Sequence, residues 1–227
     1  KESVQNTDIF NPRDGQHFED IYVSYKDIKS NTWSAPKLLE FCSPDESQAT
    51  IGISGDGEKL FVYQSRYGSD NEIYFTTRDQ DFYRLKPLDV VNSSSWENHV
   101  TISADEKTLF FVSDRPGGLG GTDIWRCLKL PNGEWSKPYN LGPPINSPYN
   151  EESPFIHPDG KTLYFSSDGE NSMGGFDIFF SKKPPKSLER ITLIKNKYFQ
   201  IITQLKPEDC LSTLIEISIN SIQLGIN

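Results

Sequence analysis

Short apolar segments alternate with turn-forming residues along most of the chain. One stretch shows four such segments in succession: Val100–Ser103, Thr108–Ser113, Asp123–Leu128 and Glu134–Leu141. β-Branched and aromatic residues are frequent within them, and Gly, Pro, Asn and Asp cluster between them, which is typical of short strands joined by tight turns. No unit contains ten residues with 3.6-residue periodicity, which argues against a helical solenoid. The pattern therefore predicts an all-β fold.

The pattern repeats with a period of about 50 residues, and three motifs share that period. A turn motif close to Ile-Ser-x-Asp-Gly places aspartates at Asp56, Asp105 and Asp159. A motif of an acid, Ile and an aromatic residue starts at Asp20, Glu72, Asp123 and Asp177. A Trp-Ser-x-Pro motif starts at Trp33 and Trp135. Three different motifs with one spacing indicate an internal structural repeat.

Each repeat holds four strand segments, which is the content of one β-propeller blade. In this frame the chain enters at the third strand of a first blade near 19–25, and the fourth strand lies at 32–39. Two complete blades follow at about 48–91 and 97–141, and three further strands occupy about 153–181. Residues 1–185 are therefore expected to form a partial propeller of about three four-stranded blades, whereas propellers close with four or more.

Residues 186–227 differ in composition from the repeats and are assigned to a separate C-terminal tail. They are rich in Ile, Asn, Leu and Ser and contain no glycine before Gly225. Apolar residues at helical spacing predict a helix over 188–205, although Ile215, Ile217 and Ile219 alternate as in a strand. Because the Trp-Ser-x-Pro motif does not return after Lys182, a truncated or frame-shifted sequence with a non-native tail stays open as an alternative.

The repeats resemble a known family of propellers. The resemblance rests on three runs that contain motifs such as Asp-Arg-Pro-Gly-Gly and Trp-Ser-Lys-Pro: Phe111–Trp125, Asn132–Gly142 and Glu151–Phe165. They are similar to the TolB-type, WD40-like repeat. More narrowly, they resemble the propeller that precedes an OmpA-like peptidoglycan-binding domain in Bacteroidetes envelope proteins, including the PorE-type component of the type IX secretion system.

This resemblance covers about residues 9–183 and implies a fold, a location and a function. It implies a six-bladed propeller in the periplasm, associated with the outer membrane, that binds other proteins of the cell envelope and has no catalytic activity or cofactor. The chain departs from the family pattern after Ser181 and has no stretch that matches the OmpA-like domain. Contact with peptidoglycan is therefore expected only through a domain absent from this chain.

Composition and charge narrow the function classes. The 227 residues carry a formal net charge of -9 and no run of basic residues, so nucleic acid and anionic membranes are not expected as partners. Cys42, Cys127 and Cys210 are far apart and form no Cys-x-x-Cys pair, which argues against zinc-ribbon and redox sites. No run of 18 apolar residues occurs, so no transmembrane segment is predicted.

The carboxylates are the first candidates for chemistry. The pairs Asp114/Asp123 and Asp168/Asp177 suggest acid–base catalysis, but the same positions are filled in successive blades. A repeated residue answers a repeated structural need, here the hydrogen bonding of backbone N–H groups in turns. We therefore predict structural roles, and no catalytic, cofactor-binding or metal-ligating role, for the repeated set: Asp20, Asp56, Asp105, Asp114, Asp123, Asp159, Asp168, Asp177, Trp33 and Trp135.

Four other motifs receive a structural interpretation in the same way. The glycine-rich stretch 117–121 lies between two strands and lacks the Gly-Lys-Ser/Thr ending of a phosphate loop. Ser54 is followed two residues later by Asp56 rather than by the glycine of a nucleophile elbow. Oxygen ligands in 168–172 suit calcium but lack the rest of a loop motif. The Trp135 motif is expected to pack between blades rather than to bind sugars.

The sequence leaves two hypotheses for the function, and they belong to different classes of protein. The favoured hypothesis is a non-enzymatic extracytoplasmic protein-binding scaffold. The alternative is a propeller hydrolase, sialidase-like or peptidase-associated, that acts on glycans or peptides. The stretch Ser54–Gly57 faintly resembles a sialidase Asp box, but its glycine comes one place early and the tryptophan is missing.

Overall fold

The computed structural model describes residues 18–66, 72–78 and 84–183. Those residues form strands, turns and loops and contain no α-helix, which confirms the predicted all-β class. The helix predicted over 188–205 lies outside the described residues, as does the whole of the assigned tail.

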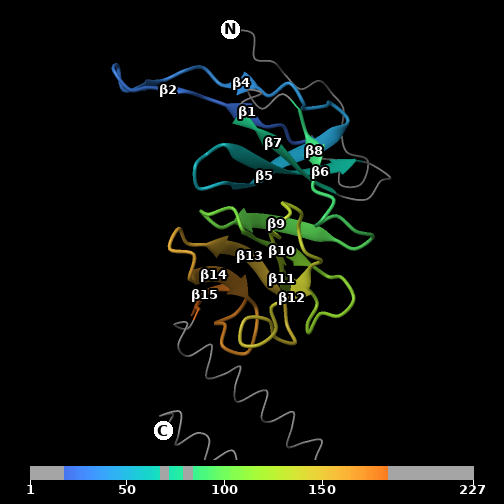
Figure 1. Cartoon of the computed structure of the whole chain (residues 1–227). Helices are drawn as coiled ribbons and strands as arrows, with labels where there is room; N and C mark the ends of the chain where they lie inside the picture. The colour runs from blue at the N-terminus through green and yellow to red at the C-terminus, as the bar shows by residue number, and fades with distance from the viewer. Residues whose placement is uncertain (1–17, 67–71, 79–83, 184–227) are drawn as a thin grey trace, which may run out of the picture. The chain divides into compact units, whose positions relative to one another are not determined.

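The strands form antiparallel sheets that follow the predicted repeat (Figure 1). The first blade contributes two short two-stranded pieces: β1 (Tyr22–Val23) with β4 (Lys37–Leu38), and β2 (Lys26–Asp27) with β3 (Thr32–Trp33). The second blade has four strands in order: β5 (Glu46–Ile53), β6 (Lys59–Arg66), β7 (Glu72–Thr77) and β8 (Lys86–Pro87).

The third and fourth blades repeat this order. The third contains β9 (Glu97–Ile102), β10 (Thr108–Ser113), β11 (Asp123–Leu128) and β12 (Tyr139–Asn140). The fourth contains β13 (Glu151–Ile156), β14 (Thr162–Ser167) and β15 (Asp177–Lys182). Sequential antiparallel strands in four-stranded sheets are the blades of a partial β-propeller.

The first strand of each of the last three blades has an irregularity at nearly the same place, with that of β5 shifted by one residue. The pairing with the second strand shifts by at least one residue in each of them. The shift lies between Thr50 and Gly52 in β5, between Asn98 and Val100 in β9, and between Glu152 and Phe155 in β13. His99 and Ser153 have φ values of 45° and 51° at these points. Such bulges add a residue to one strand and turn the following side chains, so they are part of the repeat.

The fourth strand of a blade is short because proline interrupts it. In the third blade β12 has two residues, and Lys129 and Trp135 form an isolated bridge before it. Pro138 has no N–H to donate to the ladder. The Ser136 hydroxyl accepts a hydrogen bond from the Leu128 N–H at 2.9 Å, and Ser34 accepts one from the Tyr25 N–H at the same distance. The Trp-Ser-x-Pro motif therefore pairs with the third strand partly through its serine side chain.

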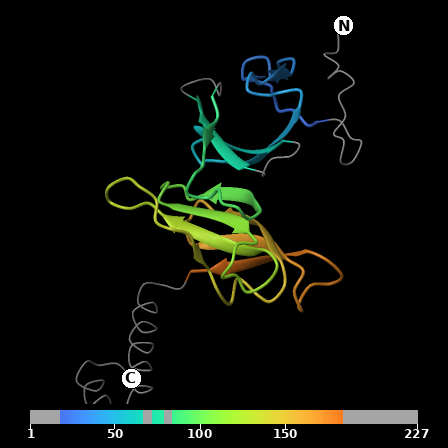
Figure 2. The same cartoon turned by 90° about the vertical axis from the view of Figure 1, so that its right-hand side faces the viewer.

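Neighbouring blades stack through apolar faces. Phe61 and Ile73 of the second blade pack with Phe111 and Trp125 of the third. Phe110 and Ile124, on the opposite face of the third blade, pack with Leu163 and Phe165 of the fourth. Figure 2 shows the backbone of the third blade (green to yellow) beside that of the fourth (orange). A smaller cluster joins Ile21, Leu39 and Val62 of the first two blades. Burial of these side chains between sheets is the main stabilising contribution of the stack.

The outward face of the fourth blade is exposed in the described part of the chain. Tyr164 and Ile178 occupy the positions of Phe110 and Ile124 in the repeat, yet their exposed fractions are 38% and 82%. Tyr164 contacts Phe180, also on this blade, with ring centroids 6.1 Å apart. The fourth blade thus presents an aromatic face whose counterpart in the third blade is an interface between blades.

An asparagine after the fourth strand ties each complete blade together. The Asn146 side chain accepts a hydrogen bond from the Ile124 N–H at 2.9 Å and donates one to the Ile124 carbonyl at 2.9 Å. Asn92 makes the same pair of bonds to Ile73, at 2.8 and 2.9 Å. In the first blade Cys42 takes this position, with its Sγ 3.3 Å from the Ile21 nitrogen. The side chain continues the ladder where the fourth strand has ended.

The close approach of the second and third blades at Gly52 yields a test of the stacking. A Cβ at Gly52 would lie 2.2 Å from the Val100 carbonyl oxygen, so Gly52→Ala must push two inner strands apart. We expect a loss of about 1–3 kcal/mol in the free energy of unfolding, as measured by urea denaturation. Gly55→Ala is the matched control, because its Cβ would meet Ala104 at 3.7 Å, an ordinary contact. Equal stability of both variants would contradict this packing.

Candidate functional site

The turn aspartates hold the hairpin between the first and second strands. Asp105 accepts hydrogen bonds from the Ser103 hydroxyl at 2.5 Å and the Lys107 N–H at 3.1 Å. Asp56 bonds the Ser54 hydroxyl and the Glu58 N–H in the same way. The hydroxyl bond, followed by the N–H bond, lowers the pKa of each of these two carboxyls.

Asp159, the third turn aspartate, accepts hydrogen bonds from a different set of groups. His157 stands at the serine position, and Asp159 accepts hydrogen bonds from the N–H groups of Lys161 and Thr162 at 2.8 and 2.9 Å. These bonds are the first causes that hold the pKa of Asp159 far below its ordinary value. In the second blade the Ser54 hydroxyl donates to Asp56 and accepts from the Lys59 N–H at 2.8 Å.

The two carboxylates of each suggested acid–base pair stand at the same end of one hairpin, since Ser113 pairs with Asp123 and Ser167 with Asp177, but they bond different segments. Asp114 accepts a hydrogen bond from the Trp96 N–H at 2.8 Å, and Asp123 accepts from the Leu119 N–H at 2.8 Å. In the fourth blade Asp168 bonds the Asn150 N–H and side chain, which lowers the pKa of Asp168, and Asp177 bonds the Met173 N–H. Each of these carboxylates engages a turn of its own.

Asp20 opens the same motif in the first blade. It is half-buried there, and burial raises the pKa of its carboxyl.

The glycine-rich stretch 117–121 packs against protein rather than forming an open cradle. A Cβ at Gly118 would lie 2.1 Å from an Asp123 oxygen, and one at Gly120 would lie 1.7 Å from the Tyr149 carbonyl oxygen. The Gly121 N–H donates to that same carbonyl at 3.0 Å. The loop therefore joins the third blade to the segment that leads into the fourth.

The two motif tryptophans differ in their surroundings. Trp135 is partly buried and packs against the core between the second and third blades. Trp33 is 66% exposed, and Lys26 Nζ lies 5.9 Å from its ring. The predicted packing between blades therefore applies to Trp135 but is not seen for Trp33, which lies in the short first blade.

The described residues contain no group of three or more His, Cys, Asp or Glu side chains placed to hold a metal ion. In the stretch considered for calcium, both Asp168 oxygens bond Asn150, and the Ser172 hydroxyl donates to the Gly169 carbonyl. Among the residues that the structure describes, no helix has the length and apolar character needed to cross a membrane.

A buried polar cluster lies at one end of the seam between the second and third blades. Glu97 has no exposed surface, and its carboxylate accepts from the Ser93 N–H and hydroxyl and from the Ser113 hydroxyl. Arg115 completes the cluster, with its Nη2 2.8 Å from Glu97 and 2.6 Å from the Val91 carbonyl oxygen. The Arg115 guanidinium carbon lies 4.7 and 5.5 Å from the ring centroids of Phe111 and Trp125.

The fourth blade repeats this cluster at its seam with the third, without the arginine. Glu151 is also fully buried and accepts from the Ser147 N–H at 2.9 Å and from the Ser147 and Ser167 hydroxyls at 2.5 and 2.9 Å. Gly169 stands at the position of Arg115, and its N–H donates to Ser167 at 3.1 Å, as that of Arg115 does to Ser113.

A cavity of about 280 Å³ lies where the side chain of an arginine at position 169 would be. Its walls include Ile145, Ser147, Glu151, Phe165, Ser167 and Phe179. Five of these residues align with those that contact the Arg115 side chain in the third blade, namely Val91, Glu97, Phe111, Ser113 and Trp125, and Ser147 aligns with Ser93 of the same polar cluster. The cavity is thus a carboxylate pocket between aromatic walls, and it is the candidate binding site of this chain.

The sequence interpretation missed this site because it followed the repeated motifs. Glu97 and Glu151 each stand eight residues before a turn aspartate, Asp105 or Asp159. Ten residues after those aspartates stand Arg115 and Gly169. A position-by-position alignment of the repeats could have found the site. It shows a glutamate with an arginine in the third blade, and the same glutamate with a glycine in place of the arginine in the fourth.

Comparisons with known proteins give similar folds among solved structures. No family model matches the chain, and no curated protein matches it. A protein described as TolB from Agrobacterium tumefaciens is 18% identical, with a TM-score of 0.49, over 71% of this chain and 56% of that one. TolB from Acinetobacter baumannii is 19% identical, with a TM-score of 0.46, over 72% and 35%.

An enzyme is also among the similar structures. The GH93 α-L-arabinofuranosidase of Fusarium graminearum is 12% identical, with a TM-score of 0.44, over 77% of this chain and 56% of that one. The chain thus covers 35% to 56% of the length of these three structures. TolB propellers are thus among the structures to which this chain is similar.

The lowered pKa values of the turn aspartates predict a pH dependence. Because the folded pKa of Asp56 and Asp105 lies below the ordinary value of 3.8, their bonds add stability above about pH 4. That stability is lost as pH falls through the folded pKa. We expect urea midpoints to drop between about pH 5 and 2.5, and to drop less in the double variant Asp56→Asn/Asp105→Asn.

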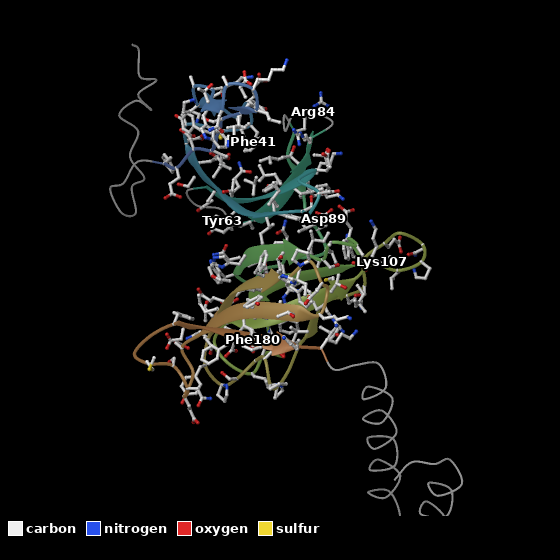
Figure 3. The ribbon with its side chains drawn as sticks, turned by 90° about the vertical axis from the view of Figure 1, so that its left-hand side faces the viewer. Phe41, Tyr63, Arg84, Asp89, Lys107 and Phe180 are labelled. Carbon is white, nitrogen blue, oxygen red and sulfur yellow. The ribbon has the colours of Figure 1, made fainter. Side chains whose placement is uncertain are left out.

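The control for this series is Asp89→Asn, which changes an exposed aspartate outside the repeated turns (Figure 3). It should keep the pH profile of the unaltered chain. A double variant whose profile matches that of Asp89→Asn would contradict the assigned role of the turn carboxylates.

Proposed function

We propose that this chain is part of a non-enzymatic protein-binding scaffold: an envelope-associated propeller of the periplasm, of the kind that precedes OmpA-like domains at the outer membrane. Its partners are other proteins of the envelope. The proposal combines the family resemblance of the repeats with the way the repeated polar side chains are used.

The disposition of the repeated carboxylates supports this function best. Asp114, Asp123, Asp168 and Asp177 bond backbone N–H groups of loops in the blades. General acid–base catalysis needs a carboxyl group within hydrogen-bond reach of the reacting atoms. Carboxylates that fix loops instead give a rigid scaffold, which presents those loops to a partner.

The loop between β14 and β15 supplies surface for such a partner. Met173 and Phe176 in this loop are 93% and 49% exposed, and Glu170 and Asn171 of the same loop line the cavity. Exposed apolar side chains beside a polar pocket are a common composition of protein interaction sites. We assign the partner-binding face to this loop and the cavity.

Photo-crosslinking tests this assignment. A photoreactive residue in place of Met173 should give one reproducible adduct in envelope extract of the source organism, and the purified partner should bind the chain saturably. The same residue in place of Ile28, which is 91% exposed in the first blade, is the control and should not give that adduct.

Two results would contradict the proposal. One is the absence of any adduct specific to position 173. The other is turnover of fluorogenic glycosides or peptides that is abolished by changing a single non-repeated Arg or Tyr, since this would identify a propeller hydrolase.

A further inference from the structure

We propose that the cavity of the fourth blade is a guanidinium-binding site that accepts an arginine side chain from a partner protein. This inference rests on the proposed protein-binding function and names the chemistry that the partner must present. The observation that carries it is an internal comparison: the third blade holds the same pocket with a guanidinium in place.

The two pockets share their hydrogen-bonding atoms. Glu97 and Glu151 are both buried, and each accepts one N–H and two hydroxyl bonds from serines at matching positions. In the third blade an arginine Nη2 adds a fourth bond at 2.8 Å. Among the described residues Glu151 has no ion pair, so its buried carboxylate is hydrogen-bonded only by neutral groups.

A cation would stabilise this arrangement. Removing a carboxylate from water is costly unless a positive charge compensates it, and bonds to a charged donor are stronger than bonds to neutral donors. Glu151 Oε1 already accepts two hydroxyl protons, as Glu97 Oε1 does beside its arginine. Ile145, which lines the cavity, stands at the repeat position of Val91, whose carbonyl accepts from Arg115.

The aromatic walls select a guanidinium rather than an ammonium group. Phe165 and Phe179 line the cavity at the positions of Phe111 and Trp125, whose rings lie within 5.5 Å of the Arg115 guanidinium carbon. A planar, weakly hydrated guanidinium stacks on aromatic faces, whereas a lysine ammonium is compact and strongly hydrated. The pocket should therefore discriminate strongly between these two cations.

The surroundings of the cavity indicate a protein as the source of the arginine. The exposed Met173 and Phe176 belong to the same loop as Glu170 and Asn171, which line the cavity. A free amino acid would place its charged ammonium and carboxylate groups beside this apolar surface, whereas a peptide places neutral backbone there. The arginine of a peptide segment can enter the pocket while its neighbours contact the loop.

Binding of blocked amino acids to the full chain tests the pocket directly. N-acetyl-arginine amide should bind with a dissociation constant on the order of 1 mM, as expected for a single buried side chain. The lysine and citrulline analogues should bind at least tenfold more weakly. Equal binding of the three compounds, or no binding of the arginine compound, would overturn the proposal. Free L-arginine that binds tenfold more tightly than the blocked form would overturn the assignment to a partner's side chain.

Two reciprocal substitutions strengthen this test. Gly169→Arg supplies the missing side chain; its Cβ would lie 3.2 Å from Ser167 Oγ, so the hydroxyl must move by only a few tenths of an ångström. We expect this variant to lose the binding and to melt roughly 2–4 °C higher. Ile28→Arg, which adds an arginine at an exposed position of the first blade, should change neither property. Arg115→Gly opens the second pocket and should raise the stoichiometry from one to two.

The partner experiment separates this inference from the proposed function. If the crosslinked partner is captured by the unaltered chain and lost by Gly169→Arg, both proposals are supported. Capture that is equal for both chains supports protein binding and overturns the arginine site. If no partner is captured, the titration with the blocked amino acids still decides whether the pocket binds guanidinium.

Discussion

The stack of blades depends on side chains that complete the backbone hydrogen bonding where strands end. The fourth strands β8 and β12 are only two residues long, so the third strand beside them would leave polar groups unpaired. Asn92 and Asn146 accept and donate in place of a backbone unit, opposite Ile73 and Ile124. Those isoleucines are fully buried between blades, so unpaired polar groups beside them would be costly. In each of the two complete blades, one isoleucine therefore needs both the apolar packing of its side chain and the asparagine bonds to its backbone.

The same constraint accounts for the repeated acidic and hydroxyl residues. Each hairpin needs an acceptor for turn N–H groups, and Asp56, Asp105 and Asp159 provide it. The start of each of the last two blades needs an acceptor for the connecting segment, and Glu97 and Glu151 provide it from a buried position. A buried acceptor with a negative charge creates a further requirement, which Arg115 fulfils in one blade. The candidate site lies in the fourth blade, where no described residue supplies a cation to Glu151.

Much of the fold could be predicted from the sequence because turn chemistry and strand periodicity are local. The repeat period placed the strand of Asp123 and the turn of Asp105 correctly, since each depends on a few adjacent residues. The bulges at His99 and Ser153 could not be predicted, because they follow from how an inner strand meets the neighbouring blade. Trp33 was wrongly expected to pack like Trp135, since the motif does not show how much sheet surrounds it. The cavity was not predicted because it depends on a residue that is missing at one position, Gly169, rather than on a motif.

Native-state hydrogen exchange tests most directly whether repeated polar side chains hold the blades. The amides of Ile73 and Ile124 are bonded to asparagine oxygens at 2.8 and 2.9 Å, whereas that of Ile21 meets a cysteine sulfur at 3.3 Å. We expect slower exchange at Ile73 and Ile124 than at Ile21. We also expect that Asn146→Ala accelerates exchange at Ile124 while Ile73 keeps its protection. Unchanged protection of Ile124 in Asn146→Ala would contradict the account.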